Sequence, residues 1–422
     1  MRTAKPRSRA ARAMRLLVLP ALLVAFLATA SSASAFPIYD VQTRWGDQNL
    51  KPGGTGEFVV IVHNNGIFAT NGSPITVQLD LPPGVTRVAP LPADPEDHEG
   101  AGWKCEGTST VLCASNEIVP SVRSGKNFDS GVANFLFVRV AIDPGASGTH
   151  AVTTTVSGGG GFIPDTDVDQ VPISSEPAGY GPVPGSFRAD VYTGGGLFAP
   201  AERTRQAGSH PYELKVDFEM NLRHQELPPR APGESTQSLT TPEEHIRTVE
   251  TTLPRGLIGN PEAVPKCEPK DFLRSGLTSY TGCPPETQVG VMDLELSNGT
   301  TKHGFGGFAN NPGWWSKVAV YNLVPPKGVP ADFGFHVALA DGHIYPKLDP
   351  EQGYSIKAEV PYTSDLAPVR HAKFTMWGVP GDPAHDEYRY TAANNGELGA
   401  SFNAPIRPFL TLGMDCTASK RF

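Results

Sequence analysis

The sequence lacks the short motifs on which most common catalytic sites are built. It contains no G-x-S-x-G nucleophile elbow, no H-E-x-x-H pair and no C-x-x-C pair, so nothing in it indicates a serine hydrolase, a zinc protease or a cysteine-based zinc site. Its glycine runs, 158–161 and 194–196, have neither the lysine nor the helix start of a phosphate loop. These absences favour a non-catalytic protein that needs no cofactor.

Basic side chains are scarce beyond the N-terminus. The chain has 35 Lys and Arg against 43 Asp and Glu, and six of the basic residues lie within the first 15 positions, where there is no acid. The rest of the chain is therefore more acidic than the overall net charge of −8. Nucleic acids and anionic membrane surfaces attract proteins through a basic footprint. We therefore expect no nucleic acid and no anionic membrane surface as partner.

The N-terminus has the three parts of a bacterial-type signal peptide. A basic segment precedes the apolar run 16–30, and Ala33, Ser34 and Ala35 offer the small residues that a signal peptidase reads. The run is shorter than the roughly 20 residues of a membrane-spanning helix, and no later segment approaches that length. We expect a signal peptide over 1–35, a secreted, extracellular mature protein and no membrane insertion after signal removal. The basic residues are Arg2, Lys5, Arg7, Arg9, Arg12 and Arg15.

Short runs of alternating apolar residues, separated by turn residues, predict an all-β fold. Glycine (45) and proline (41) are both frequent, and no helical period is sustained. The runs are rich in Val, Ile, Phe, Tyr and Thr, which favour half-buried strands. Many short strands with frequent turns are typical of β-sandwiches. The predicted strands span 57–62, 75–79, 135–142, 151–156, 213–218, 318–321, 333–339 and 355–360.

Two stretches carry helix-start signals. In 242–250, Thr241 can act as N-cap and Pro242 occupies the first helical position. The second stretch is 269–276. Both are predicted as short helices, although the Thr-rich end of the first weakens a longer version.

The mature chain is too long for one core of this kind, so two domains are expected. Ser, Pro and Gly replace any periodic pattern over 172–185. We place the boundary near residue 178, with an Ig-like β-sandwich over 36–178 and a larger β-sandwich over 179–422. A second irregular stretch, 227–241, is either a long loop or a further boundary.

Five cysteines in an exported chain make disulfides the expected state. Nearest-neighbour pairing joins Cys105 to Cys113 and Cys267 to Cys283. The second pair closes a longer loop, worth about 3 kcal/mol of chain entropy. Cys416 is then left over. Metal binding is the alternative, but the Cys and His spacing of such sites does not occur.

Both halves contain the same short motif before their cysteine pair. Residues 81–85 read L-P-P-G-V and residues 253–257 read L-P-R-G-L, each after a β-type segment. Proline ends the donation of ladder hydrogen bonds and glycine permits a tight turn. We predict that a strand ends in such a turn at both places.

These features resemble a known family. Residues 41–156 resemble the repeat of bacterial surface proteins called domain of unknown function eleven, through the strand entry at 53–65, the turn at 81–85, Trp103-Lys104-Cys105 and Cys113. The remainder is similar to the second module of large secreted actinobacterial multi-domain proteins, through 253–261 with Cys267, 283–290, 320–335 and 377–389. The resemblance implies an Ig-like extracellular surface protein and lends no catalytic residue.

The resemblance also bears on the C-terminus. Related proteins continue beyond the stretch that matches 406–412 through a Cys-containing segment into further domains, whereas this chain stops soon after Cys416. We interpret the second domain as truncated at its C-terminal end. The missing length would then hold the partner of Cys416.

Two acidic groups are candidates for a metal or acid/base site. Asp165, Asp167 and Asp169 alternate along the chain, so in a strand they share one face and could bind Ca²⁺ as carboxylate ligands. No EF-hand-type loop with a closing Glu follows, so a solvated acidic edge is the favoured interpretation. Asp382, His385 and Asp386 surround a Pro-rich turn, where capping explains them more simply.

Adjacent tryptophans suggest a different function. Trp314 and Trp315 follow a Gly- and Asn-rich stretch, and an exposed aromatic ring beside polar groups is what a sugar-binding platform uses. The main hypothesis is a non-catalytic structural or adhesive surface protein whose partner is a cell-wall glycan or another surface protein. A carbohydrate-binding module using Trp314 or Trp315 is the first alternative. A glycoside-active enzyme, which needs two carboxylates about 5–10 Å apart, is the second.

Overall fold

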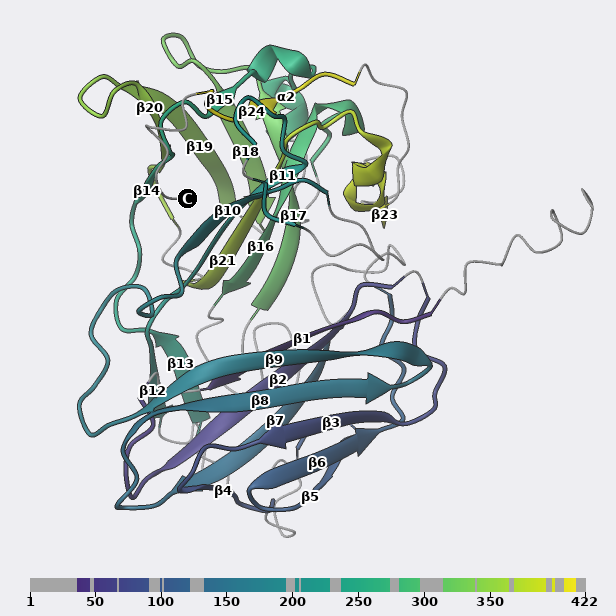
Figure 1. The fold of residues 1–422 in the computed structure, drawn as a ribbon, viewed down its shortest axis with the longest axis vertical. Coiled ribbons are helices and arrows are strands. Elements are labelled where there is room, and N and C mark those ends of the chain that lie inside the picture. Colours follow the sequence, from purple (N-terminus) through teal and green to yellow (C-terminus); the bar gives the residue numbers. More distant parts are fainter. Residues whose placement is uncertain are drawn as a thin grey trace, which may run out of the picture.

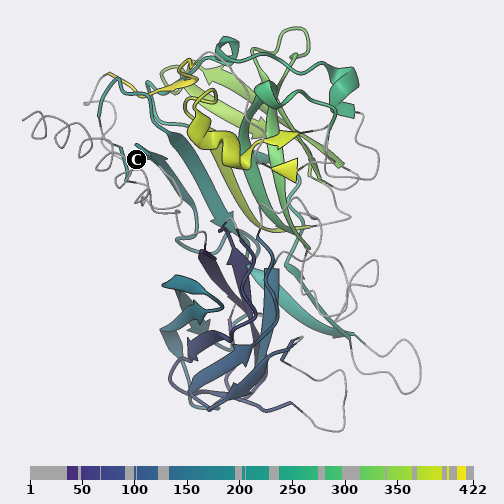
Figure 2. The same ribbon diagram turned by 90° about the vertical axis from the view of Figure 1, so that its right-hand side faces the viewer.

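The computed structural model of the chain describes most residues beyond position 35 (Figures 1 and 2). Among these residues the secondary structure is almost entirely antiparallel β, which confirms the all-β prediction. All eight predicted strand runs coincide with strands of the structure over their described residues. None of the described helices is long and apolar enough to cross a membrane. The described residues are 36–45, 49–66, 68–90, 99–100, 102–121, 133–194, 202–204, 206–227, 237–273, 281–296, 314–337, 340–363, 368–391, 397–398 and 406–414.

The N-terminal unit is a sandwich of two antiparallel sheets, in the lower half of Figure 1. Residues that alternate along these strands meet in one core between the sheets, as expected for a sheet with one buried face. One sheet has the order β1 (Tyr39–Trp45), β2 (Thr55–Asn64), β7 (Ala133–Ile142), β4 (Val85–Arg87). The other has the order β5 (Lys104–Glu106), β6 (Thr110–Ser115), β3 (Ile75–Asp80), β8 (Gly148–Gly158), β9 (Gly161–Ile173).

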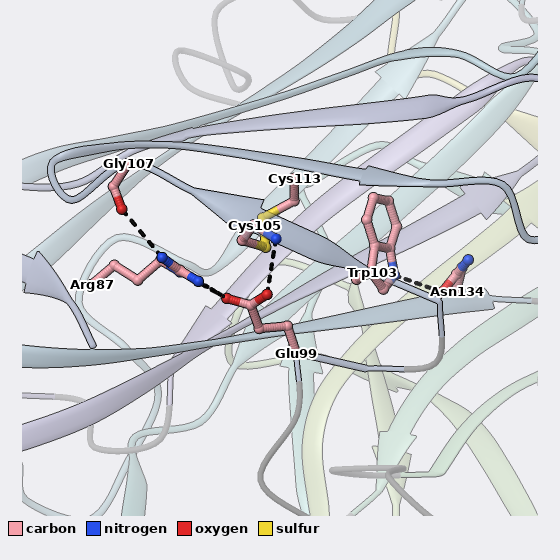
Figure 3. Close-up of a disulfide and its surroundings, with 7 residues drawn as sticks. All are labelled: Arg87, Glu99, Trp103, Cys105, Gly107, Cys113 and Asn134. Atoms are coloured by element: carbon pink, nitrogen blue, oxygen red, sulfur yellow. Dashed lines mark hydrogen bonds and ion pairs between the residues drawn. A yellow bond between two sulfur atoms is a disulfide. The ribbon is translucent and has the colours of Figure 1, made fainter. Parts of the chain in front are cut away.

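The predicted disulfide between Cys105 and Cys113 is present in this sandwich (Figure 3). It joins directly opposed residues of β5 and β6. Glu99 lies beside it, accepts the Cys105 backbone N–H at 2.9 Å and forms an ion pair with Arg87. The nearby Trp103 is buried and donates its indole N–H to Asn134 at 2.8 Å. This corner is therefore fixed by covalent, ionic and hydrogen-bonded contacts together.

The second unit is dominated by one nine-stranded antiparallel sheet that curls into a half-barrel (Figure 1). Small two-stranded sheets flank it: β12 (Leu222–Leu227) with β13 (Gln237–Pro242), β15 (Ile258–Gly259) with β24 (Leu410–Thr411), and β22 (Tyr390–Thr391) with β23 (Glu397–Leu398). The large sheet has the order β10 (Arg188–Tyr192), β11 (Glu213–Glu219), β21 (Val369–Trp377), β16 (Gln288–Leu296), β17 (Trp314–Leu323), β18 (Asp332–Val337), β19 (Ala340–Asp349), β20 (Ser355–Val360), β14 (Val249–Thr252).

Helices are few and short among the described residues. The α-helix α2 (Pro269–Phe272) lies within the predicted 269–276 stretch. The predicted helix over 242–250 is wrong, because Pro242 ends β13 and Val249 begins β14. The β-branched residues of that stretch fit a strand better than a helix. The other helices in the described ranges are 3₁₀ turns: η1 (Pro261–Ala263), η3 (Pro285–Thr287) and η4 (Pro383–Tyr388).

The second predicted disulfide, Cys267–Cys283, is also present and lies on the convex side of the large sheet. Both sulfurs belong to a small buried cluster with Phe272 of α2 and Tyr321 of β17. The Cys267 backbone bonds to Asn322 and Val324, at the end of β17. The disulfide therefore holds the segment around α2 against the outside of the half-barrel.

The repeated motif forms the same turn in both units. The Val85 N–H donates to the Pro82 carbonyl, and the Leu257 N–H donates to the Pro254 carbonyl. The glycine at the third turn position has a φ of 76° in the first turn and 84° in the second, which is a type II geometry that requires glycine. The prediction of two strand-ending turns is confirmed.

Each unit has a main apolar core of its own, apart from the small cluster around Cys267 and Cys283. The first is drawn from residues between 39 and 173, and the larger core of the second unit from residues between 191 and 412. The predicted boundary near residue 178 lies between β9 and β10.

Candidate functional site

The concave face of the half-barrel encloses a cavity of about 920 Å³. Side chains of a strand alternate between its two faces, and alternate residues of six strands of the large sheet line this space. The lining includes residues 214, 216 and 218 of β11, 292, 294 and 296 of β16, 333, 335 and 337 of β18, 340, 342, 344, 346 and 348 of β19, 356, 358 and 360 of β20, and 372, 374 and 376 of β21.

The lining is overwhelmingly aliphatic and aromatic. Its charged members among the described residues are Asp341 and Lys347. Asp341 Oδ1 lies 2.6 Å from Nδ1 of His336, and Lys347 Nζ lies 2.6 Å from Oε2 of Glu359. The Asp341 carboxylate is therefore hydrogen-bonded and Lys347 is ion-paired within the sheet. A ligand in the cavity meets mainly apolar surface.

Large apolar side chains reach solvent where the cavity opens. Ile258, Leu348, Tyr354 and Tyr362 all line the cavity and are 61%, 64%, 69% and 71% exposed. Tyr354 lies in the turn between β19 and β20 and has a φ of 60°. A bulky residue in this left-handed region is strained, and such strain is concentrated at functional sites. The cavity thus has an apolar mouth as well as an apolar interior.

This arrangement suits binding better than the chemistry of a glycosidase. Ligand pockets span about 300–1,000 Å³ and are mainly apolar with a few placed polar groups. Glycoside cleavage needs two carboxylates about 5–10 Å apart, whereas Asp341 is the one carboxylate among the described lining residues. The lining is therefore chemically suited to an apolar molecule.

The sequence contained only an indirect signal of this cavity. The strand runs 213–218, 333–339 and 355–360 were predicted correctly, and their inward residues look like ordinary core residues. Whether the inward-facing residues pack against other residues or line a cavity depends on how strongly the sheet curls. No local sequence pattern specifies that curvature.

The three aspartates considered for Ca²⁺ serve as contacts between two sheet edges. All are on β9, and they share one face as predicted. Asp165 Oδ2 accepts the Val41 N–H at 2.7 Å and Asp167 Oδ2 accepts the Thr43 N–H at 3.0 Å. These carboxylates therefore satisfy the free edge of β1, which would otherwise be open to further strand pairing. No group of three or more metal-binding side chains occurs among the described residues.

A cluster of buried charges joins the two units next to Asp169. Arg44, at the end of β1, lies 3.1 Å from Oε2 of Glu295 on β16 and 3.4 Å from Oε1 of Glu219 on β11. Arg370 of β21 lies 3.4 Å from the second oxygen of Glu295. Burial alone would raise the pKa of Glu295, but Arg370 and Arg44 outweigh it and lower that pKa. Glu295 is thus held ionised between two arginines.

Asp169, in contrast to Glu295, has a raised pKa. Burial, and then the nearby Asp167, raise its pKa to about 8, against the partial opposition of Arg44. A carboxyl whose folded-state pKa is raised stabilises the fold fully below its unfolded value near 3.8 and loses that contribution as the pH rises through about 8. Asp169 is therefore protonated at neutral pH and can donate a hydrogen bond to Asp167.

Asp169→Asn is accordingly expected to flatten the dependence of stability on pH. Wild-type protein should lose about 1–2 kcal/mol of unfolding free energy between about pH 6 and pH 9, and the variant less than half of that, because the amide keeps a donor and carries no charge. Urea unfolding at a series of pH values measures this. The exposed Glu106→Gln is the control. Equal slopes for wild type and Asp169→Asn would contradict the assignment.

The group at the Pro-rich turn is structural, as its capping interpretation predicted. Asp382 caps η4 by accepting the Ala384 N–H, and Asp386 forms an ion pair with the buried Arg389 at 3.0 Å. His385 is buried and stacks on Tyr212 and Trp377. Burial, and then Arg389, lower its pKa to about 3. A general acid or base operates best with a pKa near the working pH, so His385 is poorly suited to that role.

The remaining sequence-derived candidates are not tested by the geometry. Trp314 and Trp315 begin β17, opposite Leu296 and Glu295 of β16, but their side chains lie outside the described part of the structure. Cys416 also lies outside the described residues. Glycan binding by the tryptophans and the pairing of Cys416 remain predictions.

Comparison with known proteins adds no assignment. No protein-family model matches the chain, and no curated protein matches it. One similar solved structure is AvmM, described as catalysing macrocyclization in alchivemycin A biosynthesis, with 14% identity and a TM-score of 0.18 over 34% of this chain and 98% of AvmM. Another is the sporulation control protein Spo0M of Bacillus subtilis, with 15% identity and a TM-score of 0.20 over 48% of this chain and 78% of Spo0M. Likenesses this weak carry no argument about fold or function.

Proposed function

We propose that this protein is a non-catalytic binding protein, exported from the cytoplasm, that holds an apolar ligand in the half-barrel of its second unit. The observation that carries the proposal is the cavity of about 920 Å³ with apolar lining. Burying apolar ligand surface there yields about 25 cal/mol per Å² removed from water. An elongated hydrocarbon chain matches this lining, because no buried polar group has to be left unpaired around it.

Two observations support the proposed export of the protein from the cytoplasm. Two disulfides suggest an oxidising, extracellular environment, and the N-terminal sequence predicts removal of a signal peptide. A structural or adhesive role in the same location remains compatible with ligand binding, since the N-terminal sandwich is free to serve as a spacer or contact module.

A dye-binding experiment tests the proposal. The neutral apolar dye N-phenyl-1-naphthylamine is expected to fluoresce strongly on binding the mature protein. Ala358→Trp places an indole in the cavity from the inward face of β20 and should weaken dye binding at least about tenfold, or about 1.4 kcal/mol. Lys357→Trp adds the same ring at the next position, which faces outward, and should leave dye binding unchanged.

The outcomes separate clearly. Absence of dye binding to the wild-type protein, or equal binding to a folded Ala358→Trp variant, would contradict a ligand site in the half-barrel. Circular dichroism checks that both variants are folded. Retention of the protein on cell-wall polysaccharide, lost in Trp314→Ala or Trp315→Ala, would instead support the carbohydrate-binding alternative.

A further inference from the structure

One end of the cavity lies beside an arginine that has no acidic partner among the described residues. Arg255 occupies the second position of the turn formed by Pro254 to Leu257, next to the lining residue Gly256. No ion pair of Arg255 with a described acidic residue occurs, whereas Lys347 and Lys357 of the neighbouring strands are paired with Glu359 and Glu250. In the described part of the chain, this guanidinium is therefore a positive charge without an ion-pair partner beside an apolar cavity.

The position of this guanidinium is set by a glycine. A Cβ added to Gly353 would lie only 2.9 Å from Arg255 Cζ and 3.0 Å from its Nε. Gly353 also lines the cavity and has a φ of 67°. The hairpin between β19 and β20 thus lets the guanidinium lie flat against its backbone at the cavity mouth.

Apolar side chains surround the same place. Tyr354, with its strained backbone, follows Gly353, and its N–H donates to the Asp349 carbonyl at the other side of the hairpin. Leu348 is adjacent on β19, and both side chains are mostly exposed. Oδ1 of Asp349 accepts the backbone N–H groups of Glu351 and Gln352. Arg255 therefore lies just outside the apolar lining, against the lining residue Gly353.

We infer that the ligand is an amphiphile with an anionic head group, such as a long-chain carboxylate, and that Arg255 binds the head group while the hydrocarbon chain fills the half-barrel. This inference rests on the proposed function. A guanidinium offers a fork of N–H donors that matches a carboxylate or phosphate. The polar part of the ligand would then stay at the exposed hairpin, and the cavity would need no polar group of its own.

Displacement of the bound dye by matched competitors tests the inference. Palmitic acid and hexadecanol share a hydrocarbon chain and differ in head group. Wild-type protein should bind palmitate about tenfold more tightly than the alcohol, which corresponds to about 1.4 kcal/mol. Arg255→Gln should remove that preference by weakening palmitate alone, and Arg255→Lys should restore part of it, since it keeps the charge without the fork.

A matched control lies at the other end of the cavity. Arg247 is exposed, and its carbonyl accepts the N–H of the lining residue Thr363. Arg247→Gln should leave both affinities unchanged. Equal affinity of the wild type for acid and alcohol, or loss of the preference in Arg247→Gln and not in Arg255→Gln, would overturn the assignment of Arg255 while leaving dye binding intact. Failure of the dye itself to bind would instead refute the proposed function.

Discussion

Arg44→Met is expected to lower the free energy of unfolding by about 3–5 kcal/mol, because it removes one of the two arginines that compensate a buried carboxylate. Arg44 contacts Glu295 and Glu219, and the Glu295 side chain is only 4% exposed. Methionine fills a similar length with an apolar chain and supplies no charge. The remaining positive charge near Glu295, Arg370, satisfies the other carboxylate oxygen.

Because Arg44 connects the two units, its loss should also weaken the contact between them. Arg44 belongs to β1 of the sandwich, whereas Glu295 and Glu219 belong to the half-barrel. Removing Arg44 should therefore weaken the contact between the units. The variant should unfold at a lower urea concentration than the wild-type protein. Urea titration followed by tryptophan fluorescence measures the change.

A surface ion pair provides the control. Arg203 lies 2.9 Å from Asp190, but its side chain is 59% exposed, so Arg203→Met should cost less than about 1 kcal/mol. A double-mutant cycle of Arg44→Met with Glu295→Gln should give a coupling energy of about 1 kcal/mol or more. If Arg44→Met costs no more than Arg203→Met, the buried cluster does not hold the units together.

Local sequence patterns were sufficient to predict the strands, turns and disulfides, because these depend mainly on residues close together in the sequence. Alternation located the strands, because each strand buries one face, and Pro-Gly chemistry located both turns at 82–85 and 254–257. The disulfides followed from proximity of the cysteines along the chain. The helix expected at 242–250 does not form. Its N-terminal signals mark no helix start, because Pro242 ends β13, and β14 gains ladder bonds from β20, which lies far along the sequence.

The functional features depend on contacts between distant segments, so the sequence alone could not specify them. The face shared by Asp165, Asp167 and Asp169 was predicted, but their role became visible only with β1 beside them. Arg44 looks like an ordinary polar position of a strand until its partners on β16 and β11 are known. Similarly, Arg255 and Gly353 lie about a hundred residues apart and meet at the mouth of the cavity.

Replacing both Cys267 and Cys283 by alanine is expected to lower the free energy of unfolding by about 3–4 kcal/mol. Opening a loop of this length restores about 3 kcal/mol of chain entropy to the unfolded state. The residues are also fully buried beside Phe272 and Tyr321, so the vacated space adds a packing loss. The corresponding Cys105→Ala/Cys113→Ala variant should lose less, about 2–3 kcal/mol, because its loop is shorter and its strands already pair.

The location of Cys267–Cys283 predicts that its loss affects stability but not dye binding. This disulfide ties the segment around α2 to the convex side of the sheet, whereas the ligand cavity lies on the concave side. Dye binding measured well below the unfolding transition should therefore persist in the Cys267→Ala/Cys283→Ala variant, even though urea unfolds it sooner. Loss of dye binding in a variant that remains folded would show that the convex segment is needed to keep the half-barrel curled, and that the cavity is not an independent property of the sheet.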